Sequence, residues 1–333
     1  MKFVDNRGTT DAATNLALEE WVLRHAPADE SHLLLYVNAP SVVIGRNQNP
    51  AEEVNGPYVR EHGIQVVRRM SGGGAVYHDL GNLNFSFQAP YAPERFNRYE
   101  EFTRPVIEVL RELGVPAELN ARNDIVVGDR KISGNAQSMA AGRMFSHGTV
   151  LFCSDLDRVS EALRVSPTGR IESKSVKSVR SRVANVRDFL REPITIEEFR
   201  SRIVERALGS RGAPPTLELT EADWAGVREL RARKYATWEW NYGESPAFVV
   251  ERRTRTASGE VGVRVSVSRR GRIEELHVFG DLTHPGEVGE LRRRLTGVRF
   301  ERCAIAAALE ELPSAAHFGG LEREEVLALL EAA

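Results

Sequence analysis

The first half of the chain combines short apolar runs typical of β-strands with two stretches of helical periodicity. Residues 12–25, preceded by the capping residues Thr10 and Asp11, and residues 101–113 place apolar side chains three and four positions apart, which predicts two helices. Strands are expected at residues 33–37, 42–45, 64–67, 83–88, 125–127 and 149–152. Pro40 lies between the first two strands, which are expected to be hairpin partners. This order of elements favours an α+β fold over a repeated βαβ unit.

The second half of the chain has a different pattern. Valine alternates strictly with glycine, arginine and serine over residues 261–268, which predicts an antiparallel strand with one buried face, and 273–279 forms the next strand. Helices are expected at residues 195–208, 220–235, 284–296, 300–312 and 321–332. We therefore expect a large domain over residues 1–245 and a small α+β domain over residues 246–333.

Composition narrows the class of protein. A chain of 333 residues with 41% hydrophobic residues is long enough for two packed domains and excludes wholesale disorder. It contains neither a run of about 18 apolar residues, as a membrane helix requires, nor an apolar stretch near its start. Cys153 and Cys303 have no metal-type spacing, so we expect a reduced, cytoplasmic protein without a disulfide framework or structural zinc. The net charge of −2 argues against a nucleic-acid-binding domain.

Lysine is rare in this chain. Of 45 cationic residues 40 are arginine, and the five lysines are Lys2, Lys131, Lys174, Lys177 and Lys234. A lysine ammonium is a compact point charge whose pKa shifts readily, unlike an arginine guanidinium. Each lysine is therefore a candidate for a specific function.

The densest motif is the segment Arg68–Asp79, which has the sequence RRMSGGGAVYHD. The three glycines Gly72–Gly74 can turn their N–H groups toward one point and form an anion-binding nest, beside two arginines suited to phosphate or carboxylate. The alternative is a flexible hairpin with a bulge. The segment is not a P-loop, because no Gly-Lys pair occurs in the chain. It is not a G-x-G-x-x-G fingerprint either.

Three further residues could carry chemistry. Lys131 begins the run Lys-Ile-Ser-Gly-Asn and could meet a phosphate or carboxylate; the alternative is an exposed lysine on a hairpin. His147, in the run Ser-His-Gly-Thr, is either a structural residue or a catalyst. Cys153 could act as a nucleophile beside a base, but we favour a buried, inert thiol at a strand end.

Taken together, these motifs resemble lipoate–protein ligase, the two-domain bacterial enzyme of the biotin/lipoate ligase superfamily. The matching segments follow the family's order and are Ser41–Pro50, Arg68–Asn82, Arg122–Asp124, Lys131–Gly134 with Ala136, His147–Thr149, Lys177–Asn185, Trp238–Asn241 and Pro246–Phe248. The resemblance implies two steps, in which lipoate and ATP first form lipoyl-adenylate with loss of pyrophosphate. The lipoyl group then passes to a lysine of a lipoyl domain in a 2-oxoacid dehydrogenase complex, or of the glycine-cleavage H protein.

The resemblance also implies roles for individual residues, with Lys131 as the catalytic group that contacts both the carboxyl end and the phosphate. The expected ATP- and adenylate-binding residues are Arg69, Ser71, Gly72, Gly73, Gly74, Ala75, Val76, Tyr77, Asn82, Asp124 and Lys131. The expected lipoate-binding residues are Lys131, Gly74, His78 and His147. Asp124 is the candidate ligand of Mg²⁺ or partner of the incoming amine, and Val43 is a candidate for the acyl slot. Residues 177–185 would form a loop that closes over the adenylate; the alternative is an ordinary charged surface loop.

Three other functions stay open on the sequence alone. An octanoyl- or lipoyl-transferase would carry the acyl group on Cys153, although such relatives typically lack the C-terminal domain. A biotin ligase has a different glycine-rich motif. A non-catalytic protein that binds lipoate or lipoyl domains would have no need for an intact Lys131 and glycine loop.

Overall fold

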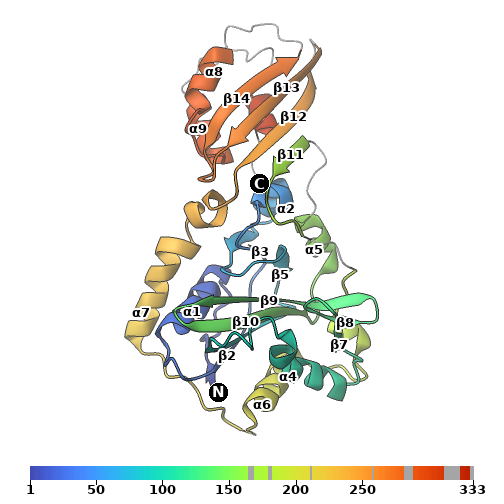
Figure 1. Cartoon of the computed structure of the whole chain (residues 1–333). Helices are drawn as coiled ribbons and strands as arrows, with labels where there is room; N and C mark the ends of the chain where they lie inside the picture. The colour runs from blue at the N-terminus through green and yellow to red at the C-terminus, as the bar shows by residue number, and fades with distance from the viewer. Residues whose placement is uncertain are drawn as a thin grey trace. The chain divides into compact units, whose positions relative to one another are not determined.

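The computed structural model describes residues 1–163, 169–178, 182–210, 212–256, 259–280, 288–310 and 323–330. The chain divides into two compact units (Figure 1). The N-terminal unit consists of Met1–Arg46, Ile64–Ser160 and Val179–Thr237, and the C-terminal unit of Asn47–Gly63, Glu161–Ser178 and Trp238–Ala333. The single boundary expected between residues 245 and 246 differs from this division, because two earlier segments pack with the C-terminal part of the chain.

A seven-stranded sheet forms the centre of the N-terminal unit. Its strands, in spatial order, are β1 (Lys2–Val4), β2 (His32–Val37), β6 (Asn82–Pro90), β10 (Arg143–Leu151), β9 (Arg130–Ala140), β8 (Asp124–Val127) and β7 (Glu118–Leu119). Every pair is antiparallel except β1 and β2, which are parallel. The α+β class expected from the sequence is confirmed.

A second sheet of three strands carries the glycine loop. It consists of β4 (Gln65–Arg68), β3 (Ser41–Ile44) and β5 (Val76–His78), with β3 in the middle. The expected hairpin between residues 33–37 and 42–45 is therefore wrong, because β2 and β3 belong to different sheets. Asn38, in the connection between them, is fully buried and bonded to Asn15 and His78, which directs the chain out of the large sheet.

Helices cover both faces of the large sheet (Figure 1). On one face, α4 (Tyr99–Glu112) and α6 (Ile196–Leu208) pack on alternate residues of β2 and β6, including Leu35, Phe85 and Phe87. On the other face lies α1 (Ala12–His25), which contacts β10 and β4. The N-terminal unit also contains η1 (Val186–Phe189), α7 (Glu221–Leu230) and the π-helical turn η2 (Arg231–Tyr235). Helix α5 (Leu156–Ala162) begins in this unit and ends in the other. The predicted helices over 12–25, 101–113 and 195–208 are confirmed to within two residues.

The C-terminal unit is built on a four-stranded antiparallel sheet. Its strands are β11 (Gly169–Ser173), β12 (Phe248–Thr256), β13 (Gly259–Val267) and β14 (Ile273–Gly280). The predicted alternation is confirmed, because the four valines at 261, 263, 265 and 267 are buried. The helices are α2 (Pro50–Glu53), α3 (Gly56–Glu61), η3 (Glu239–Gly243), α8 (Val288–Leu295), α9 (Arg302–Glu310) and α10 (Arg323–Leu329). Parts of the last three predicted helices (284–287, 311–312, 321–322 and 331–332) lie outside the described residues.

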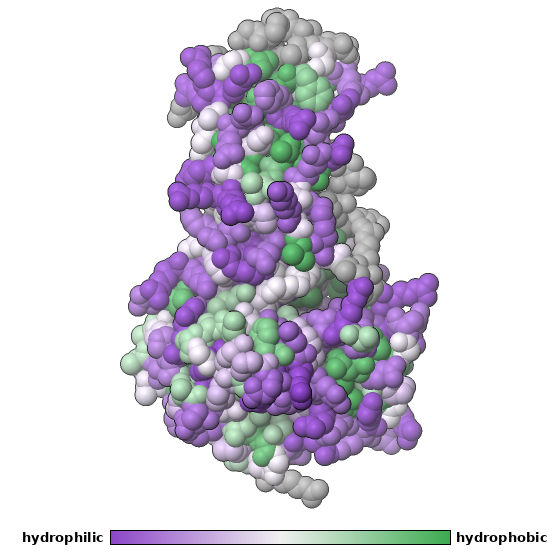
Figure 2. Space-filling model, viewed as in Figure 1, coloured by the Kyte–Doolittle hydropathy of each residue, from purple (hydrophilic) through white to green (hydrophobic). Residues whose placement is uncertain are grey.

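The surface is predominantly hydrophilic on the face seen in Figure 2, with small apolar areas between charged side chains. Among the described residues, no helix is both long and apolar enough to cross a membrane.

Candidate active site

The candidate site lies on the face of the large sheet that α1 covers. The strand register places Ala136, His147 and Ser86 side by side on this face, alternating with the core residues of the opposite face. Gly134 and Asp124 are paired on the neighbouring strands β9 and β8. Gly134 and Ala136 therefore give β9 two small residues on this face, next to His147.

Arg69 holds the glycine loop together from inside. Its guanidinium donates to the carbonyls of Val43, Gly72 and Gly74 at 3.0, 2.6 and 2.8 Å, and Nε donates to Ser71 Oγ at 3.0 Å. Four hydrogen bonds occupy most of the donor capacity of an arginine. In this structure Arg69 therefore shapes the loop, and its direct contact with a nucleotide stays a prediction.

The loop turns its carbonyls toward Arg69, which leaves its amides available for another partner. Among the described residues the N–H groups of Gly72, Gly73 and Gly74 have no hydrogen-bond acceptor. Gly73 has a φ of +88°, which favours glycine, and a Cβ on Gly45 would collide with the Gly73 carbonyl. These features are those of an anion-binding nest and argue against a featureless hairpin.

Ser71 and His147 join the loop to the large sheet. The Ser71 hydroxyl lies 2.6 Å from Nε2 of His147, and Nδ1 of His147 lies 2.9 Å from Oε1 of Glu19 on α1. All three side chains are buried. Both ring nitrogens of His147 are hydrogen-bonded, as expected of a structural residue. His147 nevertheless lies within the candidate site, so its role in binding lipoate stays a prediction.

Lys131 faces a carboxylate on the neighbouring strand. Its Nζ lies 2.8 Å from Oδ1 of Asp124, and about a quarter of its side chain is exposed. A Cβ at position 134 would lie 2.9 Å from both Cε and Nζ of Lys131, so the absence of a side chain on Gly134 makes room for the ammonium. The Lys131 backbone donates to the Arg182 carbonyl at 2.7 Å and accepts from the Ala184 amide at 3.0 Å. The lysine is thus held on three sides and is no freely exposed hairpin residue.

His78 and Asn82 are fixed by buried amides. Asn38 donates to Nδ1 of His78 at 2.9 Å, because its own carbonyl accepts from Asn15. Burial, with Arg69 and His147 nearby, lowers the pKa of His78 to about 3, so the imidazole is neutral at pH 7. Asn82 donates to Oδ1 of Asn84 at 3.0 Å. His78 Nε2 and Asn82 Oδ1 are buried without a protein partner.

Cys153 is exposed, so the expectation of a buried thiol is wrong. The chain leaves β10 at Leu151, and the Cys153 amide then bonds to the Gly81 carbonyl at 2.9 Å. Partial burial raises the pKa of the thiol, with Asp79 adding to the effect and Arg187 opposing it. A raised pKa disfavours the thiolate that a nucleophilic cysteine needs.

The segment expected to close over the site is only partly described. Lys177 pairs with Glu52 in the C-terminal unit, and residues 182–184 contact Lys131 in the N-terminal unit. Residues 179–181 lie outside the described part of the chain.

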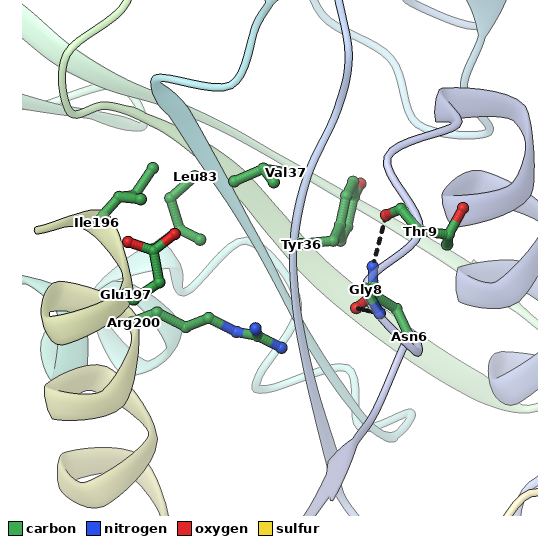
Figure 3. A pocket seen from close by; sticks show the side chains of 9 residues that line it. All are labelled: Asn6, Gly8, Thr9, Tyr36, Val37, Leu83, Ile196, Glu197 and Arg200. Carbon is green, nitrogen blue, oxygen red and sulfur yellow. Dashed lines mark hydrogen bonds between the residues drawn. The ribbon is translucent and has the colours of Figure 1, made fainter.

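A pocket elsewhere in the N-terminal unit contains none of the expected site residues (Figure 3). It is lined by Asn6, Gly8, Thr9, Tyr36, Val37, Leu83, Ile196, Glu197 and Arg200. Ile196, Glu197 and Arg200 come from α6, on the side of the sheet opposite α1 (Figure 3).

Two residues of the site were not found by sequence analysis. Glu19 and Asn38 lie far from the glycine loop in sequence and belong to no recognisable motif. For Glu19 the sequence offered one indication, which is a glutamate directly after the apolar run Leu16-Ala17-Leu18.

The slot made by Gly134 gives a direct test. In Gly134→Ala the new methyl group lies 2.9 Å from Cε and Nζ of Lys131, so the ammonium has to shift from its place beside Asp124. We expect pyrophosphate release, the first step implied by the resemblance, to fall at least tenfold while the melting temperature changes little. Gly289→Ala is the matched control, because nothing lies within 4 Å of its added methyl. Equal rates in wild type and Gly134→Ala would contradict the role of the slot.

Comparison with known proteins agrees with this geometry. The model of the lipoyl protein ligase A/B catalytic domain matches residues 11–207, and that of the bacterial lipoate protein ligase C-terminus matches residues 245–330. The lipoate-protein ligase LplJ of Bacillus subtilis is 46% identical over 332 residues, covering 99% of this chain and all of the relative. Lipoate–protein ligase 1 of Staphylococcus aureus is also 46% identical, over 330 residues, with the same coverage.

Solved structures show the same similarity. A lipoate-protein ligase A bound with ATP has a TM-score of 0.62 at 32% identity, covering 73% of this chain and 98% of that one. Protein Ta0514 of Thermoplasma acidophilum, with bound lipoic acid, has a TM-score of 0.61 at 31% identity and the same coverage. The chain therefore belongs to the lipoate–protein ligases, which are ATP-dependent enzymes.

Proposed function

We propose that this ligase forms lipoyl-adenylate between the glycine loop and Lys131 and then passes the lipoyl group to a lysine of an acceptor protein. The observation that carries this assignment is the arrangement of three unpaired loop amides and one ammonium around a strip of small side chains. The solved relatives described above hold ATP in one case and lipoic acid in another, which supports a site that accepts both.

Lys131 supplies the mobile positive charge. Attack of the lipoate carboxylate on the α-phosphate of ATP builds up negative charge, which fixed donors stabilise by several kcal/mol. In the ligand-free protein Asp124 neutralises the ammonium, so that it is held in place before substrate arrives. The carboxylate or phosphate oxygens then replace or share Asp124 as the partner of Nζ.

The glycine loop binds the nucleotide in this proposal. The amides of Gly72–Gly74 contact phosphate oxygens, and the following residues Ala75, Val76 and Tyr77 with Asn82 contact the rest of the adenylate. Arg69 contributes mainly by keeping the loop carbonyls turned inward. A buried cation beneath the nest also favours an anion above it.

In this proposal lipoate lies along the strip formed by Gly134 and Ala136 on β9. His147 borders that strip in the strand register, and neutral His78 presents an unpaired ring nitrogen close to Arg69 and His147. Burial of an eight-carbon chain contributes on the order of 5 kcal/mol at about 0.8 kcal/mol per CH₂.

Asp124 is the residue that would hold Mg²⁺. No group of three or more metal-binding side chains occurs within the described ranges. One carboxylate nevertheless fits Mg²⁺, because this ion takes most of its ligands from nucleotide phosphates and water. When bound, it would neutralise phosphate charge.

The acceptors in this proposal are lipoyl domains of 2-oxoacid dehydrogenase complexes and the glycine-cleavage H protein, in the cytoplasm. A structural study of an archaeal relative concerns a lipoate protein ligase and its E2 lipoyl domain, which supports the first class. Both cysteines are free, in agreement with a reducing compartment.

Lys131→Ala should reduce lipoylation of a lipoyl domain by about 10²-fold or more, because it removes the ammonium that meets the negative charge of the reaction. Mass spectrometry of the domain after incubation with ATP, Mg²⁺ and lipoate measures the product. Lys2→Ala is the control, since Lys2 also pairs with a carboxylate, Glu30, but lies outside the site. Wild-type activity of Lys131→Ala would overturn the assignment.

Cys153→Ser should retain full ATP-dependent ligation, because a thiol of raised pKa at the surface takes no part in the chemistry. The same mass assay measures it. Loss of acyl transfer with intact pyrophosphate release would instead identify a transferase that works through the thiol.

Raised salt should slow transfer to the lipoyl domain more than formation of the adenylate. We expect arginine side chains of this chain to attract acidic lipoyl domains, and such long-range attraction is screened by salt. Stopped-time assays of both steps between 50 and 500 mM NaCl measure the difference. Equal slowing of the two steps would contradict electrostatic steering.

A further inference from the structure

Glu19 is connected to the glycine loop through three consecutive hydrogen bonds. Arg69 Nε donates to Ser71 Oγ at 3.0 Å, Ser71 lies 2.6 Å from His147 Nε2, and His147 Nδ1 lies 2.9 Å from Glu19. We call these four residues the loop relay. Glu19 and Ser71 are each 1% exposed, so water does not substitute for any of these bonds.

The two ends of the loop relay set the direction of its hydrogen bonds when His147 is neutral. Arg69 can only donate, and a carboxylate at Glu19 can only accept. Neutral His147 then carries its proton on Nδ1 and donates it to Glu19, which leaves Nε2 as an acceptor. The Ser71 hydroxyl donates to Nε2, and its lone pair accepts from Arg69.

The relay also connects two buried groups of opposite charge, Arg69 and Glu19, through Ser71 and His147. Burial lowers the pKa of Arg69 to about 10, and the negative charge of Glu19 opposes this effect. Burial raises the pKa of Tyr36 well above its usual value and lowers that of His78 to about 3, so both nearby groups stay neutral. Among the described residues Glu19 is thus the anion that balances Arg69 at neutral pH.

We propose that Glu19 is a positioning residue for nucleotide binding, which acts through His147 and Ser71 to orient Arg69 and so keep the amides of Gly72–Gly74 directed outward. Three elements far apart in sequence, α1, β10 and the loop, are joined in this way. Loss of Glu19 leaves His147 free to change tautomer. In the other tautomer Nε2 carries the proton and no longer accepts from the Ser71 hydroxyl. The proposal rests on the assignment of the glycine loop to ATP.

The test is the affinity of the whole enzyme for ATP without lipoate, measured by titration calorimetry. We expect Glu19→Ala and Ser71→Ala each to weaken ATP binding about tenfold. The double variant should be no weaker than either single variant, because both substitutions interrupt the same relay. Glu19→Gln keeps an acceptor oxygen for His147 but loses the charge that balances Arg69, so it should bind ATP more tightly than Glu19→Ala and more weakly than wild type.

Glu20→Gln is the matched control. Glu20 is also a buried glutamate of α1, but it bonds to Lys234, Tyr235 and Arg24 and not to the relay. Its substitution should leave ATP affinity within about twofold of wild type, even where it lowers the melting temperature.

A second measurement does not depend on ATP. Histidine ¹⁵N spectra of the ligand-free enzyme, with His147 assigned from the His147→Asn variant, should show the Nδ1–H form in wild type and a tautomer mixture in Glu19→Ala. If Glu19→Ala fails to fold, the tautomer of His147 in wild type and the ATP affinity of Ser71→Ala remain as the two tests.

Three outcomes would overturn the inference. They are an unchanged ATP affinity in Glu19→Ala, additive losses in the double variant, and an Nε2–H form of His147 in wild type. Unchanged affinity in Ser71→Ala has the same meaning as the first of these outcomes, whereas a wild-type enzyme that binds no ATP would contradict the proposed function.

Discussion

The structure of the site depends on a buried cation. Arg69 lies inside the loop that it orders, where Val43, Ser71, Gly72 and Gly74 accept most of its hydrogen bonds. Burying a guanidinium is unfavourable unless its donors are bonded and its charge is balanced. The loop carbonyls meet the first requirement and Glu19 meets the second. A loop of three glycines, which would otherwise sample many conformations, thereby acquires one.

Lys131 differs from Arg69 in that its ammonium has one carboxylate partner rather than several fixed acceptors. An arginine at this position would form a planar fork with fixed partners, whereas an ammonium on a flexible stem can exchange one oxygen partner for another. The ion pair with Asp124 and the empty space at Gly134 keep Nζ near the site without saturating it. Of the five lysines, Lys2, Lys131, Lys177 and Lys234 form ion pairs with carboxylates.

Sequence reasoning succeeded where function or burial leaves a local pattern. The alternating valines at 261–267 and the motifs around Gly73 and Lys131 required only neighbouring residues, and each has the expected local structure. The hairpin predicted around Pro40 failed because a break between two strands does not say whether they rejoin the same sheet. That choice depends on the long-range bonds of Asn38. The strand at 248–256 was missed because Arg252 and Thr254 occupy its inner face, opposite the buried Val263 and Val261, and interrupt the apolar alternation.

The same distinction explains why the site was only partly found. Residues that meet a ligand occur in compact motifs, whereas those that position them are distant in sequence and need only one polar atom each. Glu19 approaches His147 because α1 packs across β10, a contact that no local pattern encodes. A buried carboxylate is nevertheless costly unless it has a partner. A glutamate within a mostly apolar helical stretch therefore indicates that a buried donor lies nearby. Applied to this chain, that rule selects Glu19 and Glu20, which bond to His147 and to Lys234.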